Sequence, residues 1–289
     1  MKTQRPKKRK IKKKPISFSV MIQKTETEIS AKESTRQHWE DFWQQKAQIE
    51  EVYSNVDRIY CNLKQVTDLK HKKILEVGAG SGRDSFKLAN EGATVYVLDF
   101  SLHALDIIQR LNQNNSVQVF PIQADAFYTP VSDDTFDIVF HQGLLEHFKN
   151  PLPLLKENYR ILKDGGFLLV DVPQRYHIYT LIKHILIFFN KWFAGWETEF
   201  SIKQLKGLVR QAGFVVRHCY GSWMRPSFFY RVCREILKKA NIRLPLYPRG
   251  VKPTRRIRDI LREHLITHRW AFYTFLDIGV IGQKIVKTK

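Results

Sequence analysis

The chain has 289 residues, of which 43% are hydrophobic, and this is enough apolar material for one large domain with a packed core. These values exclude a largely disordered protein. The three cysteines, Cys61, Cys219 and Cys233, are too far apart to give a metal-binding or redox pair. No apolar secretory segment follows the N-terminus, so we expect a reduced, cytoplasmic protein.

The formal net charge of +20 is concentrated at the N-terminus, where residues 2–14 hold nine Lys or Arg residues and no acidic residue. We interpret residues 1–20 as a basic, disordered leader. A tail of this composition can also bind RNA, anionic lipid or a nuclear import receptor. Met21 opens a more ordinary sequence, and an alternative hypothesis is that translation starts there.

Residues 30–65 have helical spacing, with Trp39, Phe42 and Trp43 on one side, and we assign residues 21–69 to an N-terminal helical cap. Strand-like runs then alternate with helical segments. These runs cover residues 74–77, 94–100, 117–124, 136–142, 167–173 and 214–220, and a last strand is expected within 272–285. The alternation predicts an α/β fold: a doubly wound, Rossmann-like sheet of seven mostly parallel strands, with helices on both faces and a final antiparallel strand.

A glycine-rich turn, LEVGAGSGRDS at residues 75–85, separates the first strand from a helix that begins at Arg83. Glycine at 78, 80 and 82 allows positive φ and close approach of the backbone to a ligand, and ligands of such sheets bind at this edge. The spacing G-x-G-x-G differs from the dinucleotide pattern G-x-G-x-x-G. Asp99 ends the second strand, where its carboxylate can accept hydrogen bonds from ribose hydroxyls.

Five motifs in chain order resemble those of the class I S-adenosylmethionine-dependent methyltransferases, in particular the small-molecule group that includes the ubiquinone and menaquinone biosynthesis enzymes. The motifs read LEVGAGSGRDS, VYVLDFS, PIQADAF, DIVFHQGLLEHF and LKDGGFLLVDVP. The resemblance spans about residues 70–220. It implies that residues 70–289 form a methyltransferase domain with S-adenosylmethionine as its cofactor.

The resemblance also implies which residues bind the cofactor. The glycine turn would line its methionine part, Asp99 would hold the ribose, Asp125 would bind the adenine amino group, and the residues after the fourth strand would lie beside the sulfonium. Asp125 also suits a helix cap. The complete predicted set is Glu76, Gly78, Ala79, Gly80, Gly82, Asp99, Phe100, Asp125, Ala126, Gln142 and Gly143, with Phe127 and Leu144 packing nearby.

Some quinone O-methyltransferases of this family bind a divalent metal through an E-x-x-E-H pattern. In this chain Gly143 stands in place of the first glutamate, which leaves Glu146 and His147 as the remaining ligands. Two ligands would hold a hard cation poorly. We therefore expect no metal, and we interpret Glu146 and His147 as residues that orient a loop.

A methyl group on a sulfonium is already activated, so positioning of the acceptor can supply much of the rate. A base is needed only if the acceptor must lose a proton. His141, His147, Tyr176 and His177 all fall near the carboxyl ends of the fourth and fifth strands. We nominate His147 and His177 as catalytic candidates; the alternative is that each is a surface or core histidine.

Two insertions, residues 174–200 and 222–266, each leave the carboxyl end of a parallel strand, and we expect them to cover the active site. They are rich in aromatic and basic residues, namely Phe188, Phe189, Trp192, Phe193, Trp196, Phe228, Phe229, Tyr230, Arg225, Arg231, Arg255, Arg256 and Arg258. This composition favours a small, apolar or lipid-like acceptor and a peripheral membrane contact. Alternatively, the aromatic residues form a core of the insertions themselves. The apolar run is too short and too often interrupted to span a bilayer.

Two other functions fit the same motifs. The basic segments would suit an RNA or tRNA methyltransferase, although nucleic acid is the less favoured partner. The sequence HQGLLEHF stands where base-amino methyltransferases carry an Asn or Asp-Pro-Pro-aromatic motif. A catalytically silent domain that only binds S-adenosylmethionine would carry the same five motifs. The acceptor atom, oxygen, nitrogen or carbon, is not specified by them.

Overall fold

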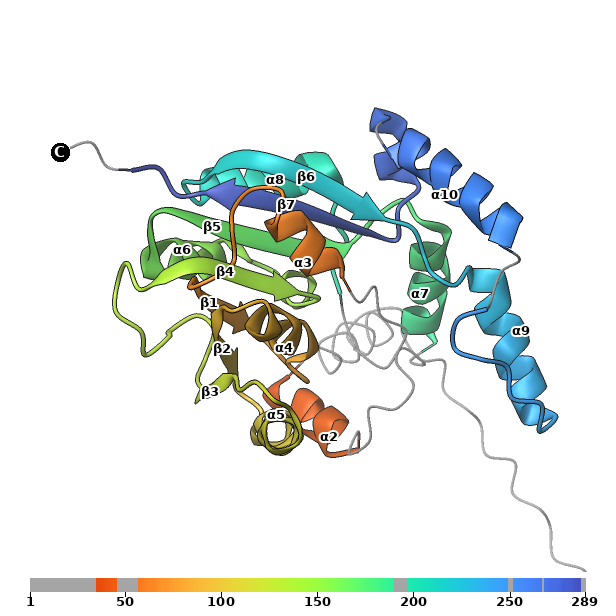
Figure 1. Ribbon diagram of the computed structural model, residues 1–289, viewed down its shortest axis with the longest axis horizontal. Helices are drawn as coiled ribbons and strands as arrows, with labels where there is room; N and C mark the ends of the chain where they lie inside the picture. The colour runs from red at the N-terminus through yellow and green to blue at the C-terminus, as the bar shows by residue number, and fades with distance from the viewer. Residues whose placement is uncertain (1–34, 46–56, 190–196, 249–251, 267, 287–289) are drawn as a thin grey trace, which may run out of the picture. The chain divides into compact units, whose positions relative to one another are not determined.

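The computed structural model describes residues 35–45, 57–189, 197–248, 252–266 and 268–286, all within the unit Ser34–Lys289. The described residues contain one seven-stranded sheet in the order β3-β2-β1-β4-β5-β7-β6 (Figure 1). Its strands are β1 (Lys73–Val77), β2 (Thr94–Asp99), β3 (Phe120–Gln123), β4 (Phe136–Gln142), β5 (Leu162–Pro173), β6 (Val215–Ser222) and β7 (Asp277–Gln283). The basic leader and Met21 lie outside the described residues.

The first five strands are parallel neighbours, and β7 runs antiparallel between β5 and β6. This confirms the predicted α/β fold with its final antiparallel strand. Two strands differ from the prediction by four residues or more in length. β3 is shorter because only Phe120–Gln123 pair with β2. β5 begins at Leu162, which pairs with Phe136 before the register shifts at a bulge.

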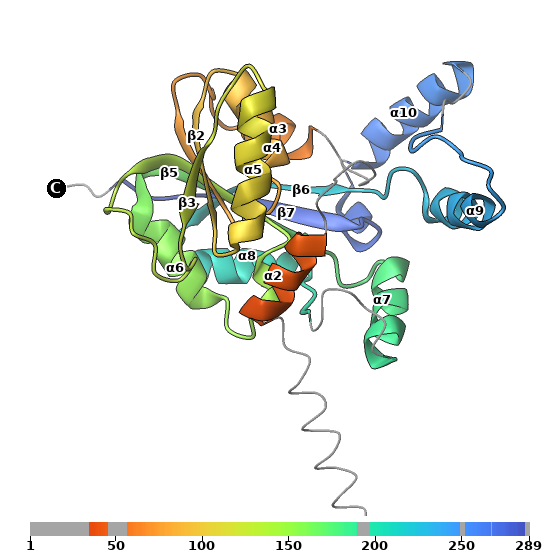
Figure 2. The same cartoon turned by 90° about the horizontal axis from the view of Figure 1, so that it is seen from below.

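Helices cover both faces of the sheet (Figure 2). They are α2 (Arg36–Gln45), α3 (Arg58–Leu63), α4 (Arg83–Asn90), α5 (Leu102–Asn114), α6 (Leu152–Ile161), α7 (Ile178–Phe188), α8 (Ile202–Gln211), α9 (Phe228–Lys239) and α10 (Lys252–Ile266). Side chains of α3, α4 and α5 join one core cluster, and side chains of α6 and α8 join the other. Ser101 caps α5 and Ser201 caps α8, each accepting from a backbone N–H of the first turn.

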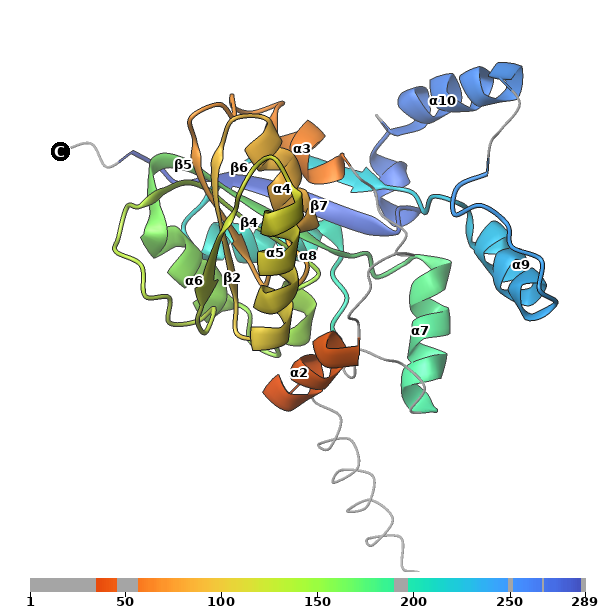
Figure 3. The ribbon, with the colours of Figure 1, turned by 60° about the horizontal axis from the view of Figure 1, so that its bottom comes forward.

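The carboxyl ends of the parallel strands meet at one edge of the sheet, and this edge positions the site. The described parts of the two insertions form α7, α9 and α10, which all three views place beyond the same edge (Figures 1–3). Trp192, Phe193, Trp196 and the side chains of Arg255 and Arg258 lie outside the described residues. No helix in the described part of the chain combines the length and the hydropathy that crossing a membrane requires.

Candidate active site

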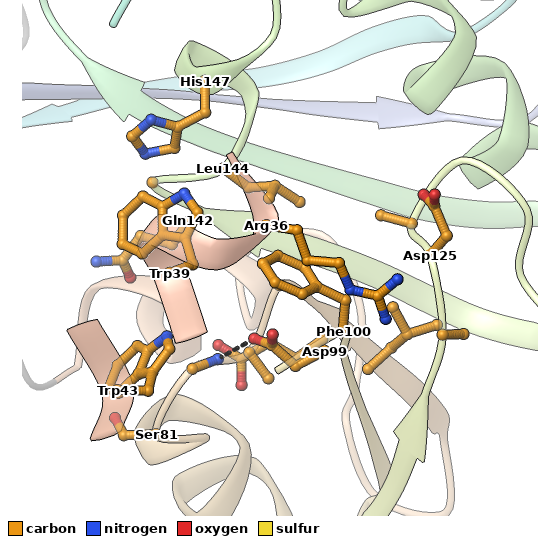
Figure 4. A pocket seen from close by; sticks show the side chains of 18 of the residues that line it. Arg36, Trp39, Trp43, Ser81, Asp99, Phe100, Asp125, Gln142, Leu144 and His147 are labelled. Carbon is orange, nitrogen blue, oxygen red and sulfur yellow. Dashed lines mark hydrogen bonds between the residues drawn. The ribbon is translucent and has the colours of Figure 1, made fainter. Parts of the chain in front are cut away.

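A pocket of about 400 Å³ opens at the carboxyl ends of β1, β2 and β4, which is a size suited to a small ligand (Figure 4). Its lining brings together ten of the eleven residues that the sequence pointed to. They are Glu76, Gly78, Ala79, Gly80, Asp99, Phe100, Asp125, Ala126, Gln142 and Gly143. Phe127 and Leu144, expected nearby, also line it. Gly82 does not belong to the lining.

The glycine turn bends through left-handed backbone at Gly78, Gly80 and Gly82, with φ values of 64°, 53° and 62°. Residues with a Cβ atom rarely adopt this conformation. A Cβ atom at Gly78 would lie 2.8 Å from Leu144 Cδ1, and one at Gly80 would overlap the Trp43 ring. Gly82 starts α4 and packs against Ile108, so its role is in packing rather than in the pocket wall.

Buried carboxyl groups fix the shape of this turn. Asp99 Oδ2 accepts a hydrogen bond from Gly80 N–H at 2.8 Å, and Asp99 Oδ1 accepts one from Ser101 N–H at 2.9 Å. Glu76 Oε2 accepts from Ser85 Oγ–H at 2.5 Å. Burial raises the pKa of Glu76 to about 8 and also raises the pKa of Asp99 and of Asp84.

Helix α2 supplies three lining residues that the sequence reasoning missed, Arg36, Trp39 and Trp43. The Arg36 guanidinium lies 5.5 Å from the centroid of the Phe100 ring. The helix is joined to α5 by Glu40 Oε1, which lies 2.8 Å from the Nδ1 atom of His103. The four-residue spacing of the two tryptophans indicated an apolar stripe, but nothing in the sequence said which surface it would face.

The remaining lining residues missed by sequence reasoning come from the turn and from the strand ends. They are Ser81, Arg83, Asp84, Leu98, Ala124 and Phe148, whereas His147, which also lines the pocket, was already a predicted site residue. Asp125 lines the pocket, and its Oδ1 accepts from Phe127 N–H at 2.9 Å within a turn; no helix begins there, so the helix cap considered for it is not formed. Gly143, at φ +66°, turns the chain after β4 and donates its N–H to Asp171 O at 3.0 Å.

The candidate histidines occupy three different surroundings. His147 lines the pocket on a short 3₁₀ turn, with its ring centroid 4.8 Å from that of Trp39. His177 is absent from the lining; its Nδ1 accepts from Tyr179 N–H at 3.0 Å and caps α7, and burial lowers its pKa. His141 is fully buried, and burial lowers its pKa to about 3, so it is neutral. Tyr176 is exposed and its ring contacts Tyr273.

A network of buried ion pairs and hydrogen bonds adjoins the pocket wall. Arg58 on α3 forms an ion pair with Asp171 at 2.9 Å, pairs with Asp277, and donates to Ser222 Oγ at 2.9 Å. Tyr220 Oη–H donates to Asp171 Oδ2 at 2.8 Å. Burial raises the pKa of Asp171 to about 7, although Arg58 opposes this shift. The network joins α3 to β5, β6 and β7, and Asp171 is the register partner of Gln142 in the pocket wall.

The residues around Glu146 do not form a metal-binding cluster. Within the described ranges, no group of three or more His, Cys, Asp or Glu side chains lies close enough to hold an ion. Glu146 is buried, and burial raises its pKa well above the usual value for a carboxyl group. A raised pKa makes this carboxyl group a poorer ligand for a hard cation, because the cation binds the deprotonated form.

Comparison with known proteins identifies the family. The model of a methyltransferase domain matches residues 75–170. A demethylmenaquinone methyltransferase from Geobacillus sp. (strain WCH70) is 30% identical over 177 residues, covering 53% of this chain and 75% of that protein. The chain belongs to the class I S-adenosylmethionine-dependent methyltransferases. The predicted family, enzyme class and cofactor are therefore confirmed.

Two further proteins, one compared by sequence and one by structure, are similar to this methyltransferase. A tRNA U34 carboxymethyltransferase from Saccharophagus degradans is 30% identical over 114 residues, covering 38% of this chain and 34% of that protein. The structure of a SAM-dependent methyltransferase from Methanosarcina mazei matches with a TM-score of 0.54 at 15% identity, covering 82% of this chain and 100% of that one. At this identity the structural match supports the fold alone.

The residues of the pocket fit S-adenosylmethionine, which carries a sulfonium and an ammonium group. The carboxyl groups of Asp84, Asp99 and Asp125 line the pocket together with the guanidinium groups of Arg36 and Arg83, whereas the Glu76 carboxyl, with its pKa of about 8, is protonated at neutral pH and adds no charge. Opposite charge favours a cationic ligand. The glycines of the turn carry no side chain, so the backbone at these positions can approach a ligand closely. When bound, this cofactor supplies an electrophilic methyl group.

Proposed function

We propose that this methyltransferase acts on a small, apolar or lipid-like acceptor, in the cytoplasm and in peripheral contact with a membrane. The observation that carries the proposal is the apolar wall on one side of the pocket. Trp39, Leu144 and His147 lie on the side away from Asp125 (Figure 4). An aromatic and aliphatic wall with one titratable group suits an acceptor with a hydrophobic ring that carries a hydroxyl group.

The proposed cofactor contacts follow from the lining. The backbone of Gly78 to Gly80 faces the methionine part, with Glu76 beneath the loop. Asp99 accepts from the ribose hydroxyls; each of its oxygens makes one backbone hydrogen bond and keeps a second acceptor site. Asp125, with Ala126 and Phe127, contacts the adenine. Gln142 and Gly143 lie beside the sulfonium, and Phe100 packs beside Arg36.

We assign the role of general base to His147. Its position in the apolar wall would allow it to take up the proton that an acceptor hydroxyl or amine releases, while the bound cofactor would supply the methyl group and leave as S-adenosylhomocysteine. His177 is assigned a supporting role, because its Nδ1 atom caps α7. Contact with Trp39 holds the His147 ring on the acceptor side.

The acceptor class is tested by methyl transfer from S-adenosylmethionine labelled in its methyl group. Purified protein is incubated with a demethylated polyprenyl hydroquinone in detergent and, separately, with total RNA. Label in the quinone fraction supports the proposal. Label in RNA alone would favour the tRNA-type function that the similarity to a tRNA U34 carboxymethyltransferase suggests. Binding of S-adenosylhomocysteine without label in either fraction would indicate a silent cofactor-binding domain.

The base is tested by His147→Gln beside His177→Gln. Loss of a general base lowers kcat by roughly 10²–10⁴-fold. We expect His147→Gln to show this loss with unchanged affinity for S-adenosylhomocysteine, and to lose the fall in rate at low pH. His177→Gln should keep kcat within a few fold. Equal kcat values for the wild type and His147→Gln would rule out His147 as the base.

A further inference from the structure

Helix α7 is turned with its polar side inward. Lys183 is only 2% exposed and Thr180 is 4% exposed, whereas Leu181 is 63% and Phe188 is 80% exposed. The exposed apolar side chains, Ile178, Leu181, Ile185 and Phe188, follow the helical spacing i, i+3, i+7, i+10 and so form one stripe. A helix in a monomeric soluble domain normally buries such a stripe, so this orientation points to an apolar partner.

Ion pairs hold α7 in this orientation. Lys183 Nζ lies 2.6 Å from Glu197 Oε2 and 2.7 Å from Glu199 Oε1, and His184 Nε2 lies 2.9 Å from Glu199 Oε2. Thr180 Oγ1–H donates to Gln174 O at 2.7 Å. Turning the helix over would leave these buried carboxyl groups without their cation, which is strongly unfavourable. The exposed apolar stripe is therefore a fixed feature of the fold.

Helices α9 and α10 expose apolar side chains in the same way. On α9, Phe229 and Ile236 are 77% and 62% exposed, while Arg234 is buried and donates to Leu244 O at 3.2 Å. On α10, Ile257 and Ile260 are more than half exposed. The rings of Tyr179 on α7 and Phe228 on α9 contact each other. The exposed apolar side chains lie on three helices beyond one edge of the sheet (Figure 3).

The same region carries a large positive charge. Residues 222–266 contain twelve Lys or Arg residues and three acidic residues. Exposed cations within the described part of this segment are Arg225, Lys238, Lys239, Arg243 and Arg256. Apolar stripes beside exposed cations are typical of helices that lie in the interface of an anionic bilayer. A surface for RNA alone would need the cations but not the apolar stripes.

We propose that α7, α9 and α10 form a docking surface for an anionic phospholipid membrane. This proposal deepens the proposed function and rests on its lipid-like acceptor. A backbone hydrogen bond links this surface to the pocket. Thr198, the residue after Glu197, donates its N–H to Glu146 O at 2.8 Å, and Glu197 is the ion-pair partner of Lys183. Glu146 directly precedes His147 in the pocket wall. A membrane bound at this surface would lie at the edge of the sheet where the pocket opens.

The test is co-sedimentation of the full-length protein with vesicles of phosphatidylcholine, with and without added phosphatidylglycerol. Wild type should bind the anionic vesicles and lose binding as salt rises. Ile185→Glu/Phe188→Glu should weaken binding at least about tenfold, and Lys238→Gln/Lys239→Gln roughly tenfold. Matched controls carry the same changes elsewhere: Ile285→Glu/Val286→Glu at the opposite sheet edge, and Lys156→Gln/Lys203→Gln on α6 and α8. All variants keep residues 1–20, so the basic leader contributes equally.

S-adenosylhomocysteine titration of every variant reports whether its fold and cofactor pocket are intact. Weakened vesicle binding with normal titration, in the α7 and α9 variants but not in their controls, supports the proposal. It is overturned if wild type binds neither kind of vesicle, or if the α7 variant binds anionic vesicles as tightly as its control. Methyl transfer to a hydroquinone in detergent would in those cases leave the proposed acceptor class standing. Vesicle binding without transfer to any lipid-like acceptor would support the surface and refute the acceptor class.

Discussion

Asp99 Oδ2 accepts a hydrogen bond from the backbone N–H of Gly80 at 2.8 Å, and this bond joins the end of β2 to the glycine turn that follows β1. The second oxygen is held by Ser101 N–H at the start of α5. One buried carboxyl group therefore orders two segments of the pocket wall and still has acceptor sites for a ligand.

Replacing Asp99 should weaken cofactor binding. Hydrogen bonds to charged groups contribute about 1.5–3 kcal/mol each, so Asp99→Ala should lower the affinity for S-adenosylhomocysteine by roughly 10–100-fold. Asp99→Asn should also lose affinity, because its amide N–H₂ group would face a backbone N–H donor. Isothermal titration measures both variants. Asp106→Ala, an exposed position on α5, is the control and should bind as wild type does.

Gly80→Ala should damage the contact between the turn and α2. The new methyl group would overlap the Trp43 ring at a left-handed backbone position, where a side chain costs about 1–2 kcal/mol. We expect a lower melting temperature and weaker cofactor binding, and partial recovery of both when Trp43→Leu is added. Gly207→Ala, inside α8 with no atom within 4 Å of its Cβ position, should instead stabilise the protein by about 0.5–1 kcal/mol. Equal melting temperatures for the two glycine variants would contradict this account.

Glu76 should make stability depend on pH. Its pKa is about 8 in the folded protein and 4.5 ordinarily. Between these two pKa values the Glu76 side chain is ionised in the unfolded chain and protonated in the folded protein. The free energy of unfolding is therefore highest below about pH 4.5 and falls as the pH rises toward 8. Glu76→Gln should therefore gain stability relative to wild type from pH 5 to pH 8, by about 5 kcal/mol at most. Urea unfolding at several pH values measures this, and a pH-independent difference would refute it.

Removal of Arg58 should destabilise the fold strongly. Arg58→Met leaves Asp171 buried without its partner, and breaking a buried ion pair from one side costs about 3–5 kcal/mol. The exposed pair of Arg160 with Asp133 provides the comparison, because Asp133→Asn should cost less than about 1 kcal/mol. Chemical denaturation of both variants is the measurement. Similar losses of unfolding free energy in the two variants would show that burial does not determine how much these ion pairs contribute to stability.

Much of the candidate site could be predicted from short-range patterns. The turn from Gly78 to Gly82, Asp99 at the end of β2 and Gln142 at the end of β4 each follow a strand whose apolar run is visible in the sequence. Strand ends in a parallel sheet meet at one edge, so residues far apart in the chain could be placed together. His177 shows the limit of this rule: it follows β5, yet it caps α7 and does not line the pocket.

The sequence by itself indicated the strands, their mostly parallel arrangement and the family, because periodicity, glycine spacing and motif order depend on neighbouring residues. Only the tertiary structure decided which surfaces face each other. In the structure, Trp39 and Trp43 of α2 line the pocket. Lys183 of α7 is buried against Glu197, whereas Phe188 of the same helix is exposed. These orientations depend on ion pairs and packing between segments that are far apart along the chain. The free energies of such contacts cannot be read from a local sequence pattern.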